Sequence, residues 1–361
     1  MKIVTVVGAR PQFIKAAAVS RVLRQENEEI LVHTGQHYDS NMSEIFFKEL
    51  SIPTPDYNLG VGSGSHAKQT AKMLVGIEEI LQKEKPQALM VYGDTNSTLA
   101  AALAASKILV DVVHIEAGLR SFNWAMPEEQ NRVLTDHISK VLFAPTDTAV
   151  KNLENEGIKQ GVYQVGDVMA DAVLYYTQDI SKSREEVFNQ LHVLIGSLEG
   201  IDKYYLATIH RAENTDTEEK LLHILQAFEE LDQPVIFPIH PRTRPAAMAR
   251  MQEEGFTNTI LVEPVGYREM LFLTQHAVKV VTDSGGLQKE AYILNTPCIT
   301  VRDQTEWVET LKGNHNILVK PDDRAIVQAV METTPDASSH PDYYGRGDAS
   351  RKITDVLAGL N

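Results

Sequence analysis

Residues 88–98 read ALMVYGDTNST and show the pattern that recurs through this chain. The run 88–92 is apolar at every position, ends at Gly93 and leads through a polar cluster into a helical pattern. A strand that is continuously apolar, rather than apolar at alternate positions, is typical of a parallel sheet buried on both faces. The stretch therefore predicts an α/β fold whose strand ends carry polar side chains.

The same alternation of apolar strand and amphipathic helix continues along the chain. Between two expected strands, for example, the apolar residues of 73–81 fall on one face of a helix. This rhythm predicts parallel, doubly wound sheets. Strands are expected at 2–7, 30–34, 88–92, 111–115, 140–144, 162–165, 204–209, 234–239, 259–263, 278–282, 297–301 and 317–319.

These strands are too many for one doubly wound sheet, and the alternation of strand and helix starts again at residue 204. We therefore expect two Rossmann-like domains facing each other across a cleft, residues 1–168 and 169–345. The polar stretch 182–202 is expected to hold a helix and a loop. Residues 346–361 are expected to form a C-terminal helix that packs back on the first domain.

Composition narrows the class of protein. The net charge of -15 argues against binding to nucleic acid or to an anionic membrane, because both kinds of partner need a basic face on the protein. The lone Cys298 cannot form an internal disulfide and suits a buried position in a reducing compartment. No apolar run is long enough to span a bilayer. We expect a cytoplasmic protein with no nucleic-acid or membrane partner.

Polar clusters rich in His, Arg, Asp and Glu follow nearly every expected strand. Ligands of doubly wound sheets bind outside the carboxyl ends of the strands, so these clusters are expected to line the cleft. They begin at Gly8, Gly35, Gly93, Glu116, His210, His240, Asp283 and Arg302.

Carboxylates are the strongest catalytic candidates. Asp94 and Glu116 end neighbouring strands, and Glu128 begins a helix. Acids that converge on one carbon can act as an acid/base set. Acids in a first helical turn also occur for dipole reasons alone, which is the alternative for Glu128. His114 shares a strand face with Glu116, but no third ligand has matching spacing, so no metal is expected.

Two glycine-bearing turns suit a diphosphate. Free N–H groups of Gly285 and Gly286, behind Ser284, would bind phosphate oxygens at a helix start, although a plain helix cap is the alternative. Glu290, one turn later, could accept hydrogen bonds from ribose hydroxyls. The turn at 8–15 adds the cations Arg10 and Lys15, without the ending of a Walker loop.

These motifs together resemble the non-hydrolysing UDP-N-acetylglucosamine 2-epimerases. The matching stretches are GARP at 8–11, GDT at 93–95, EAGLR at 116–120, PEEQNR at 127–132, HR at 210–211 and DSGG at 283–286. The resemblance implies the GT-B architecture, a homodimer, no cofactor, and an isomerase acting on a UDP-sugar. It also implies a mechanism in which UDP is eliminated across C1–C2 to give 2-acetamidoglucal and is then added back. The products would serve as precursors of cell-surface polysaccharides.

The resemblance also implies residue roles. The proton-handling carboxylates would be Asp94, Glu116 and Glu128, with His210 assisting at the diphosphate. The UDP-binding set would be Arg10, Lys15, Ser284, Gly285, Gly286 and Glu290. An activating second UDP-N-acetylglucosamine site would involve Gln36, His37, Arg211 and His240, with Lys72 standing where an arginine is usual.

Departures from the family pattern leave alternatives open. Trp307 stands where the family has a UDP-contacting arginine. The stretches 93–98 and 211–214 resemble a sister branch that epimerises UDP-2,3-diacetamido-2,3-dideoxy-glucuronate at C2. A GT-B glycosyltransferase that uses a UDP-sugar donor would share the fold and the phosphate site, and a hydrolysing epimerase would share the residues.

Overall fold

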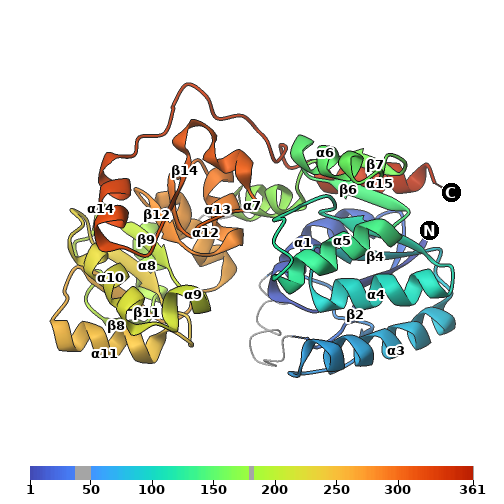
Figure 1. The fold of residues 1–361 in the computed structure, drawn as a ribbon, viewed down its shortest axis with the longest axis horizontal. Coiled ribbons are helices and arrows are strands. Elements are labelled where there is room, and N and C mark those ends of the chain that lie inside the picture. Colours follow the sequence, from blue (N-terminus) through green and yellow to red (C-terminus); the bar gives the residue numbers. More distant parts are fainter. Residues whose placement is uncertain (37–49, 179–182, 361) are drawn as a thin grey trace. The chain divides into compact units, whose positions relative to one another are not determined.

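The computed structural model describes residues 1–36, 50–178 and 183–360. It divides into two compact units, one of Met1–Tyr175 with Tyr343–Asn361 and the other of Tyr176–Asp342 (Figure 1). The division falls within helix α7 (Val168–Gln178). Residues 169–175 and 343–345, which the sequence analysis assigned to the second domain, are thus grouped with the first.

The first unit holds a sheet of seven strands in the order β3-β2-β1-β4-β5-β6-β7, counted over the described residues. Every described pairing in this sheet is parallel. The six strands predicted for this part of the chain are present, and the short β3 was not predicted. The bounds are β1 (Lys2–Val7), β2 (Glu28–His33), β3 (Tyr57–Asn58), β4 (Ala88–Tyr92), β5 (Asp111–Ile115), β6 (Val141–Ala144) and β7 (Val162–Gln164).

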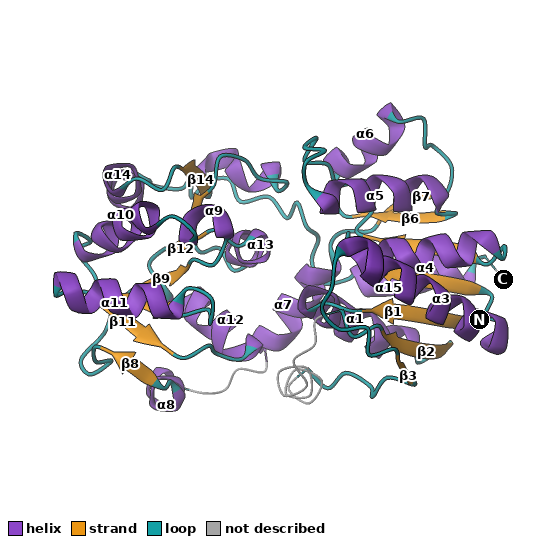
Figure 2. Cartoon of the chain, turned by 60° about the horizontal axis from the view of Figure 1, so that its bottom comes forward, coloured by secondary structure: helices purple, strands orange, loops and turns teal. Residues whose placement is uncertain are grey.

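Helices cover both faces of this sheet because successive side chains of a strand point to opposite sides (Figure 2). On β1, Val4 and Val6 join a core formed with α3 (His66–Glu84) and α4 (Asn96–Lys107). Thr5, between them, donates to Glu29 at 2.7 Å, and Ser20 of α1 (Arg10–Leu23) donates to the same carboxylate at 2.9 Å. The continuous apolar strand inferred from sequence is therefore buried from two sides.

The helices α5 (Pro127–Ile138) and α6 (Asp147–Asn155) follow β5 and β6 in this unit. The C-terminal helix α15 (Ala349–Ala358) packs against α1 of the same unit. Both oxygens of Asp171 in α7 receive backbone N–H groups from its start, Ala349 at 3.0 Å and Ser350 at 2.7 Å. A buried carboxylate is thus the anchor of α15.

The second unit repeats the design with a sheet in the order β14-β13-β12-β9-β10-β11-β8, again over the described residues. The edge strand β8 is antiparallel to β11, and the other pairings are parallel. The bounds are β8 (Val193–Ile195), β9 (Tyr205–Thr208), β10 (Val235–Pro238), β11 (Thr259–Val262), β12 (Val280–Thr282), β13 (Cys298–Val301) and β14 (Asn316–Val319). Its helices are α8 (Arg184–Gln190), α9 (Ala212–Thr215), α10 (Glu218–Glu229), α11 (Arg244–Glu254), α12 (Tyr267–His276), α13 (Gly285–Ile293) and α14 (Asp323–Glu332), with a 3₁₀ segment η1 (Val308–Asn314).

The prediction for residues 182–202 is correct for the helix α8 and for the loop at 196–202, and it missed the short strand β8. This strand has three residues and gains its identity only by pairing with β11, where Ile195 lies opposite Leu261. Elsewhere in this unit the expected strands are present, and two Rossmann-like domains are confirmed.

Strand order reverses direction at one place in each sheet. In the first unit β1 lies between β2 and β4, and in the second β9 lies between β10 and β12. The connections leaving the two neighbouring strands there run to opposite faces, which opens a crevice at their carboxyl ends. The turns after β1 and β4, and those after β9 and β12, are therefore the positions at which each sheet can bind a ligand.

Candidate active site

In the first unit, an acid in the turn after β5 meets a cation of α1 beside the turn after β4. The Glu116 carboxylate forms an ion pair with Lys15 of α1, and both side chains are buried. Gly93 has a left-handed φ of 61°, and a Cβ on it would lie 3.2 Å from Glu116 Oε2 and 3.4 Å from Lys15 Nζ. Glycine is thus required here both by the backbone and by the packed ion pair.

Asp94 follows this glycine, and two residues of α5 contact it. Its carboxylate forms an ion pair with Arg132, and its carbonyl accepts a hydrogen bond from Asn131 Nδ2 at 2.9 Å. Glu128 precedes these two residues by three and four positions, so it lies on the same helix face. It is exposed, and within the described part of the chain it has no hydrogen bond or ion pair. Asp94, Glu116 and Glu128 therefore gather at one end of this sheet.

The neighbouring Glu129 has a different task. Its buried carboxylate accepts from the N–H and hydroxyl of Ser121 and from the N–H of Phe122, at 2.8, 2.9 and 2.8 Å. Phe122 has a φ of 58°. Glu129 therefore holds the loop before α5, and it is a structural residue rather than a proton-handling one.

Glu116 itself is in an unusual backbone conformation, with a φ of 71°. Side-chain-bearing residues rarely adopt this region, and such strain gathers at functional sites. Glu116 and Ala117 both donate their N–H to the Phe143 carbonyl at 3.1 Å, which holds the turn. The conformation aims the carboxylate back towards Gly93 and Lys15.

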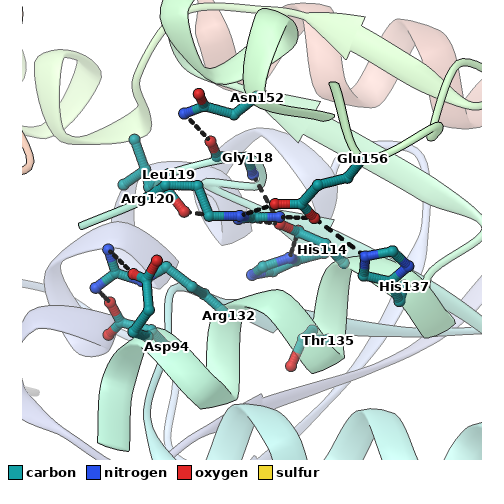
Figure 3. Close-up of polar contacts among 12 residues, drawn as sticks. Asp94, His114, Gly118, Leu119, Arg120, Arg132, Thr135, His137, Asn152 and Glu156 are labelled. Atoms are coloured by element: carbon teal, nitrogen blue, oxygen red, sulfur yellow. Dashed lines mark hydrogen bonds and ion pairs between the residues drawn. The ribbon is translucent and has the colours of Figure 1, made fainter. Parts of the chain in front are cut away.

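His114 and Asp136 are both buried, and Figure 3 shows His114 among the polar residues around these turns. Burial by itself would raise the pKa of Asp136, but the charges and hydrogen bonds of His114 and Arg120 outweigh it and hold that pKa below its usual range. Arg120 reaches Asp136 at 2.7 Å and also grips Glu156 with two hydrogen bonds of 2.6 and 2.8 Å. Both ring nitrogens of His114 have protein partners, so they are not available to a metal. Among the described residues no group of three or more His, Cys, Asp or Glu could hold one.

In the second unit, Asp283 at the end of β12 organises the turn after β9. This fully buried carboxylate accepts the N–H groups of His210 and Arg211 and the side-chain amide of Asn214, at 2.9 to 3.1 Å. His210 Nδ1 lies 3.3 Å from Asp283 Oδ1, and its ring stacks on that of His240. Burial lowers the pKa of His210 below its ordinary value; Asp283 opposes this change and Arg211 adds to it. His210 is therefore neutral at neutral pH.

The start of α13 is where the sequence predicts a phosphate site. Ser284 is its N-cap, and a Cβ on Gly286 would meet nothing closer than Ser284 Oγ at 4.0 Å, so that side of the backbone is open. At Gly285 a Cβ would lie 2.7 Å from Glu306 Oε1, so this glycine makes room for a carboxylate of the chain itself. Glu306 is in turn 3.2 Å from buried Arg302. Glu290 is buried further along the helix.

Trp307 is buried, and the ammonium of Lys289 lies 3.8 Å above its ring. A cation over an aromatic face is attracted by the ring quadrupole. The position at which the resembling family has an arginine thus belongs to a buried cation–π pair in this chain. Arg302 lies near the start of α13, where its Nη1 would be 3.7 Å from a Cβ placed on Gly285.

The residues proposed for a second UDP-sugar site are dispersed over both units. Gln36 accepts the N–H and hydroxyl of Ser97 at the start of α4, at 3.0 and 2.7 Å. Lys72 is exposed on α3, Arg211 precedes α9, and His240 accepts the N–H of Arg242 at 3.1 Å. His37 lies outside the described residues. Roles in regulation therefore stay predictions.

Sequence reasoning overlooked the residues that orient the carboxylates. Gln12 accepts the N–H groups of Gly8 and Ala9 and donates to the Tyr92 carbonyl at 2.8 Å, which ties the turn after β1 to β4. Asn131, Arg132 and Asp136 lie inside one amphipathic helix. Only Asn131 and Arg132 carried a signal, since they follow Glu128 at helical spacing.

Comparison with known proteins agrees with this geometry. The family model described as UDP-N-acetylglucosamine 2-epimerase matches residues 21–358. A Methanococcus maripaludis protein described as a UDP-N-acetylglucosamine 2-epimerase homolog is 53% identical over 363 residues, covering 100% of both chains. The UDP-2,3-diacetamido-2,3-dideoxy-D-glucuronate 2-epimerase of Pseudomonas aeruginosa is 48% identical, again with 100% coverage of both. The crystal structure of Methanocaldococcus jannaschii UDP-GlcNAc 2-epimerase in complex with UDP-GlcNAc and UDP is 42% identical, with a TM-score of 0.86 over 99% of this chain and 100% of that one.

Two largely parallel sheets, each with charged turns at its reversal point, are the arrangement expected of a protein that binds a nucleotide sugar. The family model and the relatives match nearly the full length of the chain, so the chain belongs to the UDP-N-acetylglucosamine 2-epimerase family. None of the helices in the described part combines the length and apolar character that crossing a bilayer requires.

Proposed function

We propose that the chain is a non-hydrolysing UDP-N-acetylglucosamine 2-epimerase, an isomerase that interconverts UDP-GlcNAc and UDP-ManNAc. One observation carries this proposal. Asp94 and Glu116 follow the neighbouring strands β4 and β5, and Glu128 lies on the α5 face that contacts Asp94, in a chain similar over 99% of its length to a relative bound to UDP-GlcNAc and UDP.

The chemistry explains why several acids are needed. The proton on sugar C2 is not acidic, because no carbonyl adjoins that carbon. Elimination of UDP across C1–C2 gives 2-acetamidoglucal, and re-addition of UDP with a proton on the other face inverts C2. The reaction needs a base on one face of C2 and an acid on the other, which Asp94, Glu116 and Glu128 supply.

The second unit holds the leaving UDP in this mechanism. Free N–H groups at the start of α13, behind Ser284 and including Gly285 and Gly286, bind phosphate oxygens. Glu290 accepts from the ribose hydroxyls. His210 is neutral at neutral pH, so it can donate a hydrogen bond to the diphosphate without trapping it as a fixed cation would.

Arg10 and Lys15 of the first unit are further cations that bind the diphosphate in this proposal. We further propose that the enzyme is a cytoplasmic homodimer that uses no cofactor and supplies precursors of cell-surface polysaccharides.

Isotope exchange tests the mechanism. In heavy water, UDP-GlcNAc supplied without any acceptor should yield both epimers, each with deuterium at C2, as read by proton NMR and mass spectrometry. Both epimers with protium only at C2 would rule out the elimination route. Turnover that depends on an added acceptor would indicate a glycosyltransferase, and free N-acetylmannosamine would indicate a hydrolysing enzyme.

One comparison supports a second substrate. Identity to the diacetamido-glucuronate enzyme is 48%, above the 44% of two relatives described as UDP-N-acetylglucosamine 2-epimerases and below the 53% of the relative described as a UDP-N-acetylglucosamine 2-epimerase homolog. Trp307, which stands where the resembling family has an arginine, pairs here with Lys289. Parallel assays with UDP-GlcNAc and with UDP-2,3-diacetamido-2,3-dideoxy-glucuronate decide between them by comparison of kcat/KM.

A further inference from the structure

We infer that Asp136 and His114 form a buried positioning pair that fixes the geometry of both Asp94 and Glu116. Neither residue reaches the substrate in this inference; each acts through the turns that carry the two carboxylates. The inference rests on the proposed function, because it assigns a role in that reaction to residues that the function itself does not require.

Hydrogen bonds at both ring nitrogens hold His114 in place. Its Nε2 lies 2.8 Å from the Gly93 carbonyl, which can only accept, so Nε2 carries a proton. Its Nδ1 lies 2.7 Å from Asp136 Oδ1, and Asp136 Oδ2 accepts from Gly118 N–H at 3.0 Å and from Arg120 at 2.7 Å. The charges and hydrogen bonds of His114 and Arg120 hold the pKa of Asp136 below its usual range, so this carboxylate is ionised and accepts from its neighbours. His114 therefore connects a carboxylate to a backbone carbonyl.

Asp136 clamps the turn of Glu116 from both sides. One oxygen holds His114, two residues before Glu116, and the other holds the N–H of Gly118, two residues after it. Glu116 between them has the left-handed φ of 71°, which a side chain disfavours unless the surroundings impose it. A single carboxylate thus spans and maintains the strained turn.

His114 transmits the same constraint to Asp94. Its second nitrogen holds the carbonyl of Gly93, the residue before Asp94, and the Glu116 carboxylate packs against that glycine. His114 is 0% and Asp136 1% exposed, so water cannot replace either contact. Both proposed catalytic acids are therefore connected to one rigid, charged cluster.

Glu156, which belongs to the same hydrogen-bond network, offers a matched control. Glu156 grips Arg120 with two hydrogen bonds and also contacts His137 at 3.0 Å, as Figure 3 shows. It touches neither carboxylate turn. Glu156→Gln should therefore weaken the network without moving Asp94 or Glu116.

The test compares Asp136→Asn and His114→Gln with Glu156→Gln in the full-length protein. Asparagine removes the charge of Asp136, and glutamine keeps a donor for the Gly93 carbonyl but loses the contact with Asp136. We expect kcat to fall about 100-fold in Asp136→Asn, as for catalytic groups displaced by about 1 Å, and less in His114→Gln. UDP binding measured by calorimetry should persist in both, and Glu156→Gln should keep its kcat while its melting temperature falls.

A purely structural role predicts a different pattern. If Asp136→Asn and His114→Gln fold and lose melting temperature but keep the wild-type kcat per folded molecule, the inference is overturned. Should Asp136→Asn not fold, the kcat of His114→Gln decides. Failure of the proposed function is distinguishable, because then the wild-type enzyme itself would epimerise neither UDP-sugar.

Discussion

At the scale of single residues, the site depends on positions whose backbone is unusual. Gly93 and Glu116 both have left-handed φ values, and they pack closely together. A Cβ on residue 93 would lie 3.2 Å from Glu116 Oε2, so the carboxylate would have to shift. The sequence marked Glu116 as a candidate by its type and its place after a strand. The strained turn and its ion pair with Lys15 make it a defined, buried carboxylate.

Gly93→Ala tests this arrangement. The new Cβ costs about 1 kcal/mol for the left-handed backbone and also pushes on Glu116 and Lys15. We expect kcat to fall about 10- to 100-fold, measured by epimer formation from the UDP-sugar.

The matched control is Gly255→Ala at the end of α11. Gly255 has a φ of 71° but nothing within 4 Å of an added Cβ. It should lose a similar stability and keep full activity. Equal kcat values for the two variants would contradict the role of Gly93.

At the scale of elements, α5 combines proposed catalytic and structural tasks in one helix. Asn131 and Arg132 contact Asp94, Glu129 accepts hydrogen bonds from the preceding loop, and Asp136 contacts His114 of β5. Arg132 lies three residues after Glu129 and four before Asp136, so the two tasks occupy neighbouring positions on the helix surface. A shift of this helix would therefore move every proposed proton-handling group of the first unit.

The C-terminal helix α15 is held by Asp171, and this contact can be tested directly. Asp171→Ala leaves the N–H groups of Ala349 and Ser350 without their acceptor and should lower the free energy of unfolding by about 1–2 kcal/mol. Denaturant unfolding measures the loss. Asp348→Ala is the control, since exposed Asp348 makes no side-chain cap and pairs only locally with Lys352, so its effect should stay within about 0.5 kcal/mol. Equal losses in the two variants would refute the anchoring role.

At the scale of the whole molecule, the residues proposed to bind UDP belong to both folded units. Arg10 belongs to the first unit, whereas Ser284 and the start of α13 belong to the second. Ligand bound by the native state raises the free energy of unfolding, by about 2.7 kcal/mol at a ligand concentration 100 times Kd.

Arg10→Ala should therefore reduce the thermal stabilisation conferred by UDP, although the phosphate cradle lies in the other unit. Loss of a charged hydrogen bond predicts binding about tenfold weaker or more, measured by calorimetry. Arg351→Ala, which removes an exposed arginine of the first unit that pairs with Glu26 and Asp355, should bind UDP like the wild type. Unchanged UDP binding by Arg10→Ala would contradict the proposed role of Arg10.

Local chemistry was enough to predict most of the fold. The apolar strands and the polar clusters behind them are properties of neighbouring residues, so 88–98 by itself indicated a buried parallel strand with a functional end. Strands without this signature escaped prediction: β3 has two residues and β8 three, and both depend on a neighbouring strand.

The sequence by itself determined the two Rossmann-like domains, the family resemblance and the choice of Asp94, Glu116 and Glu128, because period, residue type and order along the chain are local properties. Tertiary structure decided which groups meet. Lys15 and Glu116 are 101 residues apart, and His114 and Asp136 are 22 apart on different elements. Strand order places β1, β4 and β5 side by side, and only that placement turns separate charges into an ion pair and a positioned set of acids.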